Sequence, residues 1–234
     1  MSDSASLLAG IEKVQKGPLR EQIQALIKKL ILTNRLHPGQ SIVIDHLASE
    51  LGVSHTPVRE ALAMLQRDGL VRTKPYENPR VTEIDASDVR EVWEMRILLE
   101  GWVAGKAALT LSDEALGKIS ESLQKARQHA LKSSYDAHLE SDIAMHEMIL
   151  QTADNSLFER LAQLVNDRST RIRWLVEATG SSQDVLTIID EHYTILEALQ
   201  ARDPELTRQR LISHLEAGMK RTLAAVEKIA AKKE

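Results

Sequence analysis

The stretch LASELGVSHTPVREALAMLQRDGL, residues 47–70, decides the fold of the first part of the chain. It begins with apolar residues at helical spacing, which Gly52 interrupts. A second helix can then start near Ser54 or Thr56, either of which can cap it, and Pro57 is tolerated in its first turn. This second helix repeats apolar residues at helical period, namely Val58, Ala61, Leu62 and Leu65. The pattern predicts a helix-turn-helix, although the spacing alone is equally typical of a plain hairpin inside an all-helical protein.

The polar side of the second helix carries a candidate DNA-reading surface. The apolar stripe leaves His55, Thr56 and Arg59 together on the opposite side, near the N-terminal end. A recognition helix presents this end to base edges in the major groove. Arg59 is the strongest candidate for a base contact, to guanine, with His55 and Thr56 beside it.

Two segments carry a family resemblance. GVSHTPVREAL followed by LQRDGLV resembles the DNA-binding domain of the GntR family of bacterial transcription regulators, and PLREQIQALIKKLILTNRLHPGQ upstream resembles that family's first helix and its Pro-Gly turn. The resemblance implies a winged helix-turn-helix over residues 18–84, after a flexible N-terminus over residues 1–17. The family usually carries Arg where this chain has His55, and Gly at the wing tip where it has Asn78, a residue type that tolerates positive φ better than most.

The wing is also visible in the residue pattern. Alternation in residues 70–73 and 80–82, around a loop bracketed by prolines, predicts a β-hairpin. The net charge of −4 means that any DNA contact must be local. The candidates for phosphate contacts are Arg72, Lys74 and Arg80 on the hairpin and Arg20 on the first helix. Scattered cations of this kind are as often plain solvated surface.

Composition narrows the class of protein. The 234 residues suffice for two modest domains, and a hydrophobic share of 43% is ordinary for a globular protein. The lack of cysteine excludes disulfides, thiolate catalysis and cysteine-bound zinc, and fits a reducing cytoplasm. No apolar run reaches the roughly 20 residues of a membrane span, and the first residues do not resemble a secretory signal. We therefore expect a cytoplasmic protein with no membrane partner.

From Ile84 onward the pattern is that of an all-α antiparallel helical bundle of about six helices, so the fold class is mainly α. Long amphipathic stretches follow one another with short polar breaks. They predict helices near residues 87–108, 112–131, 134–152, 156–178, 183–201 and 204–230. The second domain is accordingly expected over residues 85–230.

Ionisable residues fall on the inward faces of these helices. Asp142 and His146 share a helical stripe with leucine and isoleucine, while His192 and His214 each lie among apolar residues of their own helices. Burying three imidazoles and a carboxylate unpaired would cost several kcal/mol, so they must find each other, another partner or a metal. A single buried histidine is more often a hydrogen-bonded core residue, but the four together favour a divalent metal.

A second resemblance supports this interpretation. DIAMHEMI, EHYTILEALQARD and RLISHL, within about residues 87–225, are similar to the FCD ligand-binding domain of the FadR subgroup of GntR regulators. In metal-binding members of that domain an Asp and three His hold a metal, and their positions match Asp142, His146, His192 and His214. The resemblance therefore implies a divalent metal cofactor. Zinc is the expected ion, with nickel or manganese as alternatives.

Arg96 is an unusual inward residue. It falls with Glu100 inside the apolar face of the first bundle helix, and an inward guanidinium needs an anionic partner. It can form a buried pair with Glu100, or it can bind a small organic acid as carboxylate-binding FCD domains do. Arg168 and Arg171 could share effector binding, although a packing or dimer-interface role is favoured for them.

These features together predict a transcription regulator and not an enzyme. It would bind a pseudo-palindromic operator on double-stranded DNA as a homodimer, as a repressor, and respond to a small carboxylate effector. One alternative is a metal-dependent, hydrolase-type enzyme built in a helical bundle. Against it, HExxH is absent and no additional inward Glu or His suggests a general base. In a further alternative the metal is purely structural.

Overall fold

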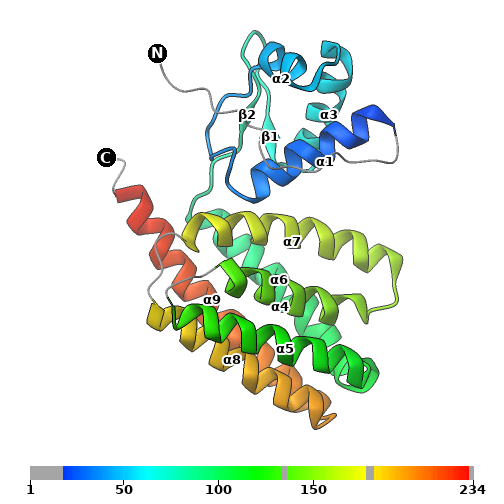
Figure 1. Cartoon of the computed structure of the whole chain (residues 1–234), viewed down its shortest axis with the longest axis vertical. Coiled ribbons are helices and arrows are strands. Elements are labelled where there is room, and N and C mark those ends of the chain that lie inside the picture. The colour runs from blue at the N-terminus through cyan, green and yellow to red at the C-terminus, as the bar shows by residue number, and fades with distance from the viewer. Residues whose placement is uncertain (1–17, 133–135, 178–181, 232–234) are drawn as a thin grey trace. The chain divides into compact units, whose positions relative to one another are not determined.

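The computed structural model describes residues 18–132, 136–177 and 182–231 (Figure 1). The chain divides into two compact units between Ile84 and Asp85, and each unit has its own hydrophobic core. The described residues are mainly helical and contain one small two-stranded sheet, which confirms the predicted fold class. The expected flexible N-terminus, residues 1–17, lies outside the described residues.

The first unit is a helix-turn-helix followed by a short hairpin. Its elements are α1 (Leu19–Leu32), α2 (Ile44–Leu51), α3 (His55–Arg67), β1 (Val71–Arg72) and β2 (Arg80–Val81). The apolar stripe of α3 is buried, as predicted, and packs against α1. The strands β1 and β2 pair antiparallel, and Ser41 adds an isolated bridge to Arg80.

The turn between α2 and α3 depends on Gly52. This residue ends α2 with φ of 66°, a left-handed conformation that glycine adopts without steric penalty. Ser54 precedes α3 as its N-cap residue, but its side chain makes no capping hydrogen bond. Asp45 lies in the first turn of α2, which starts at Ile44.

The tip of the wing differs from the expectation. Tyr76, and not Asn78, has the positive φ, at 65°. Pro79 explains this difference, because a proline restricts the preceding residue to extended conformations. Pro75 and Tyr76 occupy the centre of a turn closed by a 3.2 Å hydrogen bond from the Glu77 N–H to the Lys74 carbonyl, with the positive φ at its third residue.

The second unit is a bundle of helices whose bounds lie within about two residues of those predicted. They are α4 (Ala86–Thr110), α5 (Asp113–Ala130), α6 (Asp136–Gln151), α7 (Ser156–Glu177), α8 (Ser182–Gln200) and α9 (Pro204–Ala231). A capping box starts α4, since the Asp85 carboxylate accepts hydrogen bonds from the Ser87 and Asp88 N–H groups. The Asp88 carboxylate in turn accepts from the Asp85 N–H.

The packing of the bundle places α6 in its interior. This helix contacts α4, α5, α7 and α8, while α4 packs along α9, and α5 lies beside α8 (Figure 1). Side chains on several faces of α6 therefore meet other helices and not solvent. Among the described helices, none combines the length and the apolar character needed to cross a lipid bilayer.

Candidate metal centre and adjoining cavity

The bundle brings together the four residues proposed as metal ligands. Asp142 and His146 come from α6, His192 from α8 and His214 from α9, and all four side chains are buried. Each offers one potential ligand atom, and these atoms all lie within 4.8 Å of one another. The i, i+4 spacing on α6 points the Asp142 and His146 side chains in the same direction.

Two further carboxylates orient the histidine rings. Glu100 on α4 contacts Nδ1 of His146, and Glu191 on α8 lies 2.7 Å from Nδ1 of His214. A carboxylate that accepts from one ring nitrogen leaves the other nitrogen free to bind a metal. In His146 that other nitrogen, Nε2, lies 3.3 Å from Asp142 Oδ1.

The ring nitrogens nearest Asp142 fit a metal better than a hydrogen-bond network. His192 Nε2 lies 3.1 Å from the same Asp142 oxygen. Despite these short distances, His146 Nε2 and His192 Nε2 have no partner with hydrogen-bond geometry among the described residues. Three imidazoles and one carboxylate form a donor set that suits zinc and other divalent transition metals.

Burial and neighbouring charges set the protonation of the cluster. Burial lowers the pKa of His192 to about 4, so the ring is neutral at pH 7. Burial would also lower the pKa of His146, but the Glu100 and Asp142 carboxylates together outweigh it and raise that pKa. Because a metal takes the place of the second proton on an imidazolium, metal binding at His146 would release a proton.

Arginines balance the buried carboxylates. Burial would raise the pKa of Asp142, but Arg173 on α7 contacts its Oδ2 and holds that pKa well below the ordinary value. Arg96 Nε donates to Glu100 Oε1 at 2.8 Å, which is one of the two roles expected for Arg96. Against the effect of burial, Arg96 and His146 lower the pKa of Glu100 from 4.5 to about 2. The ionised Glu100 therefore stabilises the fold above about pH 4.5, and this contribution is lost as the pH falls towards 2.

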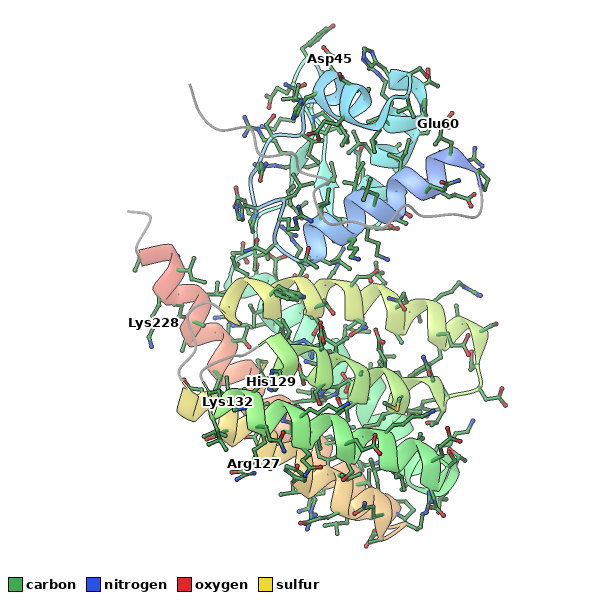
Figure 2. The ribbon with its side chains drawn as sticks, viewed as in Figure 1. Asp45, Glu60, Arg127, His129, Lys132 and Lys228 are labelled. Atoms are coloured by element: carbon green, nitrogen blue, oxygen red, sulfur yellow. The ribbon has the colours of Figure 1, made fainter. Side chains whose placement is uncertain are left out.

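A cavity of about 270 Å³ adjoins the cluster. Its polar wall includes Arg96, His138, Asp142, Arg173, His214 and Arg221. Its apolar wall includes Trp93, Leu139, Val176, Val185, Ile188 and Leu215. Lys228, labelled in Figure 2 on the last turns of α9, also lines it.

Hydrogen-bond donors without partners gather on this wall. Arg96 Nη2, Arg173 Nε and Nη2, and Arg221 Nε are buried and find no acceptor among the described residues. Each guanidinium already pairs with one carboxylate: Arg96 with Glu100, Arg173 with Asp142, and Arg221 with Glu191. Arg221 binds both oxygens of Glu191, at 2.7 and 2.8 Å. The spare donors can hold an additional anionic group inside the cavity.

Of the three arginines predicted from the sequence to bind the effector, one lines the cavity. Arg96 lines the cavity, whereas Arg168 and Arg171 are not among the residues that line it, and Arg173 of the same helix is. Arg221 could have been found, because it follows His214 by seven residues, and that spacing keeps two residues on one helical face. His138 is buried and also lines the cavity.

The seven residues expected to contact DNA are all exposed on the first unit. They are Arg20, His55, Thr56, Arg59, Arg72, Lys74 and Arg80. His55 begins α3, and its Nε2 lies 3.4 Å from the exposed Asp45 carboxylate on α2, which Figure 2 labels. Arg80 donates to the Gly39 carbonyl at 3.1 Å, so part of its guanidinium is used within the unit.

Comparisons with known proteins identify a known domain in each of the two units. The family model described as bacterial regulatory proteins, gntR family, matches residues 19–77, and the model of the FCD domain matches residues 91–217. The chain is 27% identical to the transcriptional regulator YdhC of Bacillus subtilis over 84% of this chain and 88% of YdhC. It is 25% identical to the transcriptional repressor RspR of Escherichia coli over 85% of this chain and 86% of RspR. The solved structure of Escherichia coli McbR/YncC has the same fold, with a TM-score of 0.76 at 23% identity, over 88% of this chain and 98% of that one.

The Arg96–Glu100 pair yields a stability prediction. Glu100→Gln should reduce the free energy of unfolding by roughly 3 kcal/mol, because it leaves the Arg96 guanidinium buried without its counter-charge. The double variant Arg96→Met/Glu100→Gln should recover much of that loss. Urea unfolding followed by circular dichroism measures both. Equal stability of Glu100→Gln and the original protein would show that the buried pair does not hold this part of the bundle together.

Proposed function

This chain belongs to the GntR family of bacterial regulatory proteins and carries an FCD domain, and we propose that it is a metal-containing, effector-responsive transcriptional repressor. The observation that carries the proposal is the cavity beside the Asp142, His146, His192 and His214 cluster, whose wall holds spare guanidinium donors. RspR, a relative along most of the chain, is itself named a repressor.

The first unit would read operator DNA through α3. Arg59 is exposed one turn into that helix, where a guanidinium can form two hydrogen bonds with guanine in the major groove. His55 and Thr56 precede it at the helix start, and the wing cations Arg72 and Lys74 would contact phosphates. Since one such module covers only a half-site, a two-fold symmetric homodimer would bind a pseudo-palindromic operator.

The second unit would hold a divalent metal at the cluster of one aspartate and three histidines. Zinc is the first candidate because three imidazoles and one carboxylate match its usual ligands, while nickel and manganese are the alternatives. Glu100 and Glu191 would orient His146 and His214 from behind, as outer carboxylates do in many metal sites. When bound, the ion would supply a Lewis-acidic position facing the cavity.

The effector would be a small organic acid. An unpaired carboxylate in a buried cavity would be costly, but Arg96, Arg173 and Arg221 all present unused N–H groups there. The apolar side chains opposite them suit a short carbon skeleton. Effector binding would alter operator affinity only to the extent that it favours one of two states of the repressor.

An apolar face on α4 and α7 would serve dimerisation. Leu98 and Trp102 on α4 are 63% and 57% exposed, and Leu157 and Leu161 on the adjacent α7 are 58% and 45% exposed. The Trp102 ring lies 5.1 Å from that of Phe158, measured between centroids, so the two helices form one continuous face. A contiguous apolar surface of this kind favours burial against a second copy of the chain.

A metal-dependent hydrolase is the rival function. Glu100 and His138 lie near the cluster, but Glu100 is engaged by both Arg96 and His146 and so is not free to act as a general base. The relatives that extend over most of the chain are named transcription regulators. A purely structural metal is the remaining alternative, and the effector response of metal-free protein distinguishes it.

The DNA-binding proposal predicts the effect of Arg59→Ala. Loss of a two-pronged contact with guanine should weaken specific operator binding by about 1–3 kcal/mol and relax sequence preference at that base. Fluorescence anisotropy with operator and scrambled DNA at fixed salt measures it. Arg67→Ala, at the other end of α3, is the matched control and should bind normally. Unchanged operator affinity of Arg59→Ala would refute the assignment.

The metal proposal predicts the behaviour of His146→Ala and His192→Ala. Each should fall from one bound ion per chain to none by elemental analysis, keep operator binding, and lose the response to any acid that releases the original protein from DNA. His129→Ala, an exposed position labelled in Figure 2, should keep the metal. A response to acid that survives in metal-free variants would leave the metal a structural role at most.

The dimerisation proposal predicts that Leu98→Glu/Leu161→Glu is monomeric. Two carboxylates on the apolar face would have to be desolvated in the dimer, so light scattering should give half the original mass. Leu131→Glu changes an equally exposed leucine at the end of α5 and should remain dimeric. A dimeric double variant with a native circular dichroism spectrum would exclude this face as the interface.

A further inference from the structure

Trp93 on α4 has a buried indole N–H that nothing in the described structure satisfies. Its side chain is 2% exposed, and Nε1 has no hydrogen-bond partner among the described residues. A buried tryptophan N–H usually finds an acceptor, because leaving a donor unpaired away from water costs free energy. Trp93 also lines the cavity, so the acceptor can come from a molecule held there.

Gly218 on α9 keeps the space near this N–H open. A Cβ at position 218 would lie 3.3 Å from Trp93 Nε1, and Gly218 lines the same cavity. The glycine is not needed for its backbone conformation, since it is absent from the described positive-φ residues, and glycine inside a helix is less stable than alanine. The absence of a side chain at position 218 therefore serves to leave space beside the indole N–H.

The other glycines inside described helices of the bundle do not have this relation to a polar atom. At Gly101 the space is taken by the Ile212 side chain, at 3.1 Å, and at Gly105 by Pro204, at 3.3 Å, so both permit close packing of α4 and α9. Nothing lies within 4 Å of a Cβ placed at Gly117 on α5. Gly218 differs because its missing side chain would face an unsatisfied donor.

The indole lies next to the cationic part of the wall. The Arg96 guanidinium carbon is 5.3 Å from the Trp93 ring centroid, and Arg96 Nη2 is a spare donor. A carboxylate bound by Arg96 would thus bring its neighbouring carbons towards the indole. Nε1 only donates a hydrogen bond, so its partner must be an acceptor, and a hydroxyl or carbonyl oxygen carried by one of those carbons would serve.

We propose that Trp93 Nε1, with the space left by Gly218, is a specificity subsite that selects acids carrying a hydroxyl or carbonyl oxygen near the carboxylate. The inference rests on the proposed effector site and adds the class of effector, which is a hydroxy or oxo acid in preference to the plain carboxylic acid of the same skeleton. A site built to satisfy a donor rejects an analogue that lacks the acceptor, because the donor is then buried unpaired.

The test compares matched acids on the full-length, metal-loaded protein. Isothermal titration with 2-hydroxybutanoate, 3-hydroxybutanoate and 2-oxobutanoate against butanoate, and with malate against succinate, gives the ratio of dissociation constants within each pair. At least one oxygenated acid should bind about tenfold more tightly than its plain partner, as expected for one added hydrogen bond. Trp93→Phe should reduce that ratio to about one while the plain acid keeps its affinity.

Gly218→Ala provides a second variant that leaves the indole in place. The new methyl group should shield Nε1 and reduce the same ratio, whereas Gly117→Ala should leave it unchanged. A ratio near one in the original protein, or a preference that survives in both variants, overturns the subsite while the effector site stands. If none of the acids binds, both the subsite and the proposed effector function are overturned.

Discussion

The second unit depends on the solvation of one buried carboxylate. Asp142 is charged, is 6% exposed, and lies among His146, His192 and Arg173. A charge in that position is stable only when opposite charges or aligned donors replace the water it has lost. Arg173 from α7 supplies the opposite charge at one carboxylate oxygen. At the other oxygen, His146 Nε2 and His192 Nε2 lie 3.3 and 3.1 Å away, where a bound metal would complete the balance of charge. The helices around α6 thus bring polar partners to this carboxylate in addition to apolar packing.

The same requirement connects the candidate metal site to the cavity. Glu191 accepts from His214 and also binds Arg221, so one carboxylate serves a ring facing the cluster and a guanidinium facing the cavity. Glu100 does the same for His146 and Arg96. A ligand that draws on either arginine would therefore act on a carboxylate that also orients a histidine. A ligand in the cavity would thus reach the cluster through the buried Glu100 or the half-buried Glu191.

The sequence predicted the helices and the four clustered residues well because both follow from local periodicity. Breaks at Ser112, Asn155 and Pro204 coincide with helix starts, and a polar residue inside an apolar stripe is conspicuous. The arginines were harder to assign. On α7 five consecutive residues, 169–173, are buried, so no single stripe shows which arginine faces the cavity. Glu191 and Arg221 become recognisable only when α8 and α9 are placed side by side, since their pairing is between helices. The position of the positive φ at the wing tip was also missed, because Pro79 restricts the backbone of Asn78, and Tyr76 adopts the positive φ instead.

The distribution of tryptophan gives this regulator an internal optical probe. All three tryptophans, Trp93, Trp102 and Trp174, belong to the second unit, and the first unit has none. Intrinsic emission excited at the indole band therefore originates entirely from the bundle, even when DNA is bound to the helix-turn-helix. Trp93 lies against the cavity and Trp102 on the exposed face of α4, so quenching by a small molecule and by a macromolecular neighbour would affect different rings. The protein can thus report the state of its second unit without an added label.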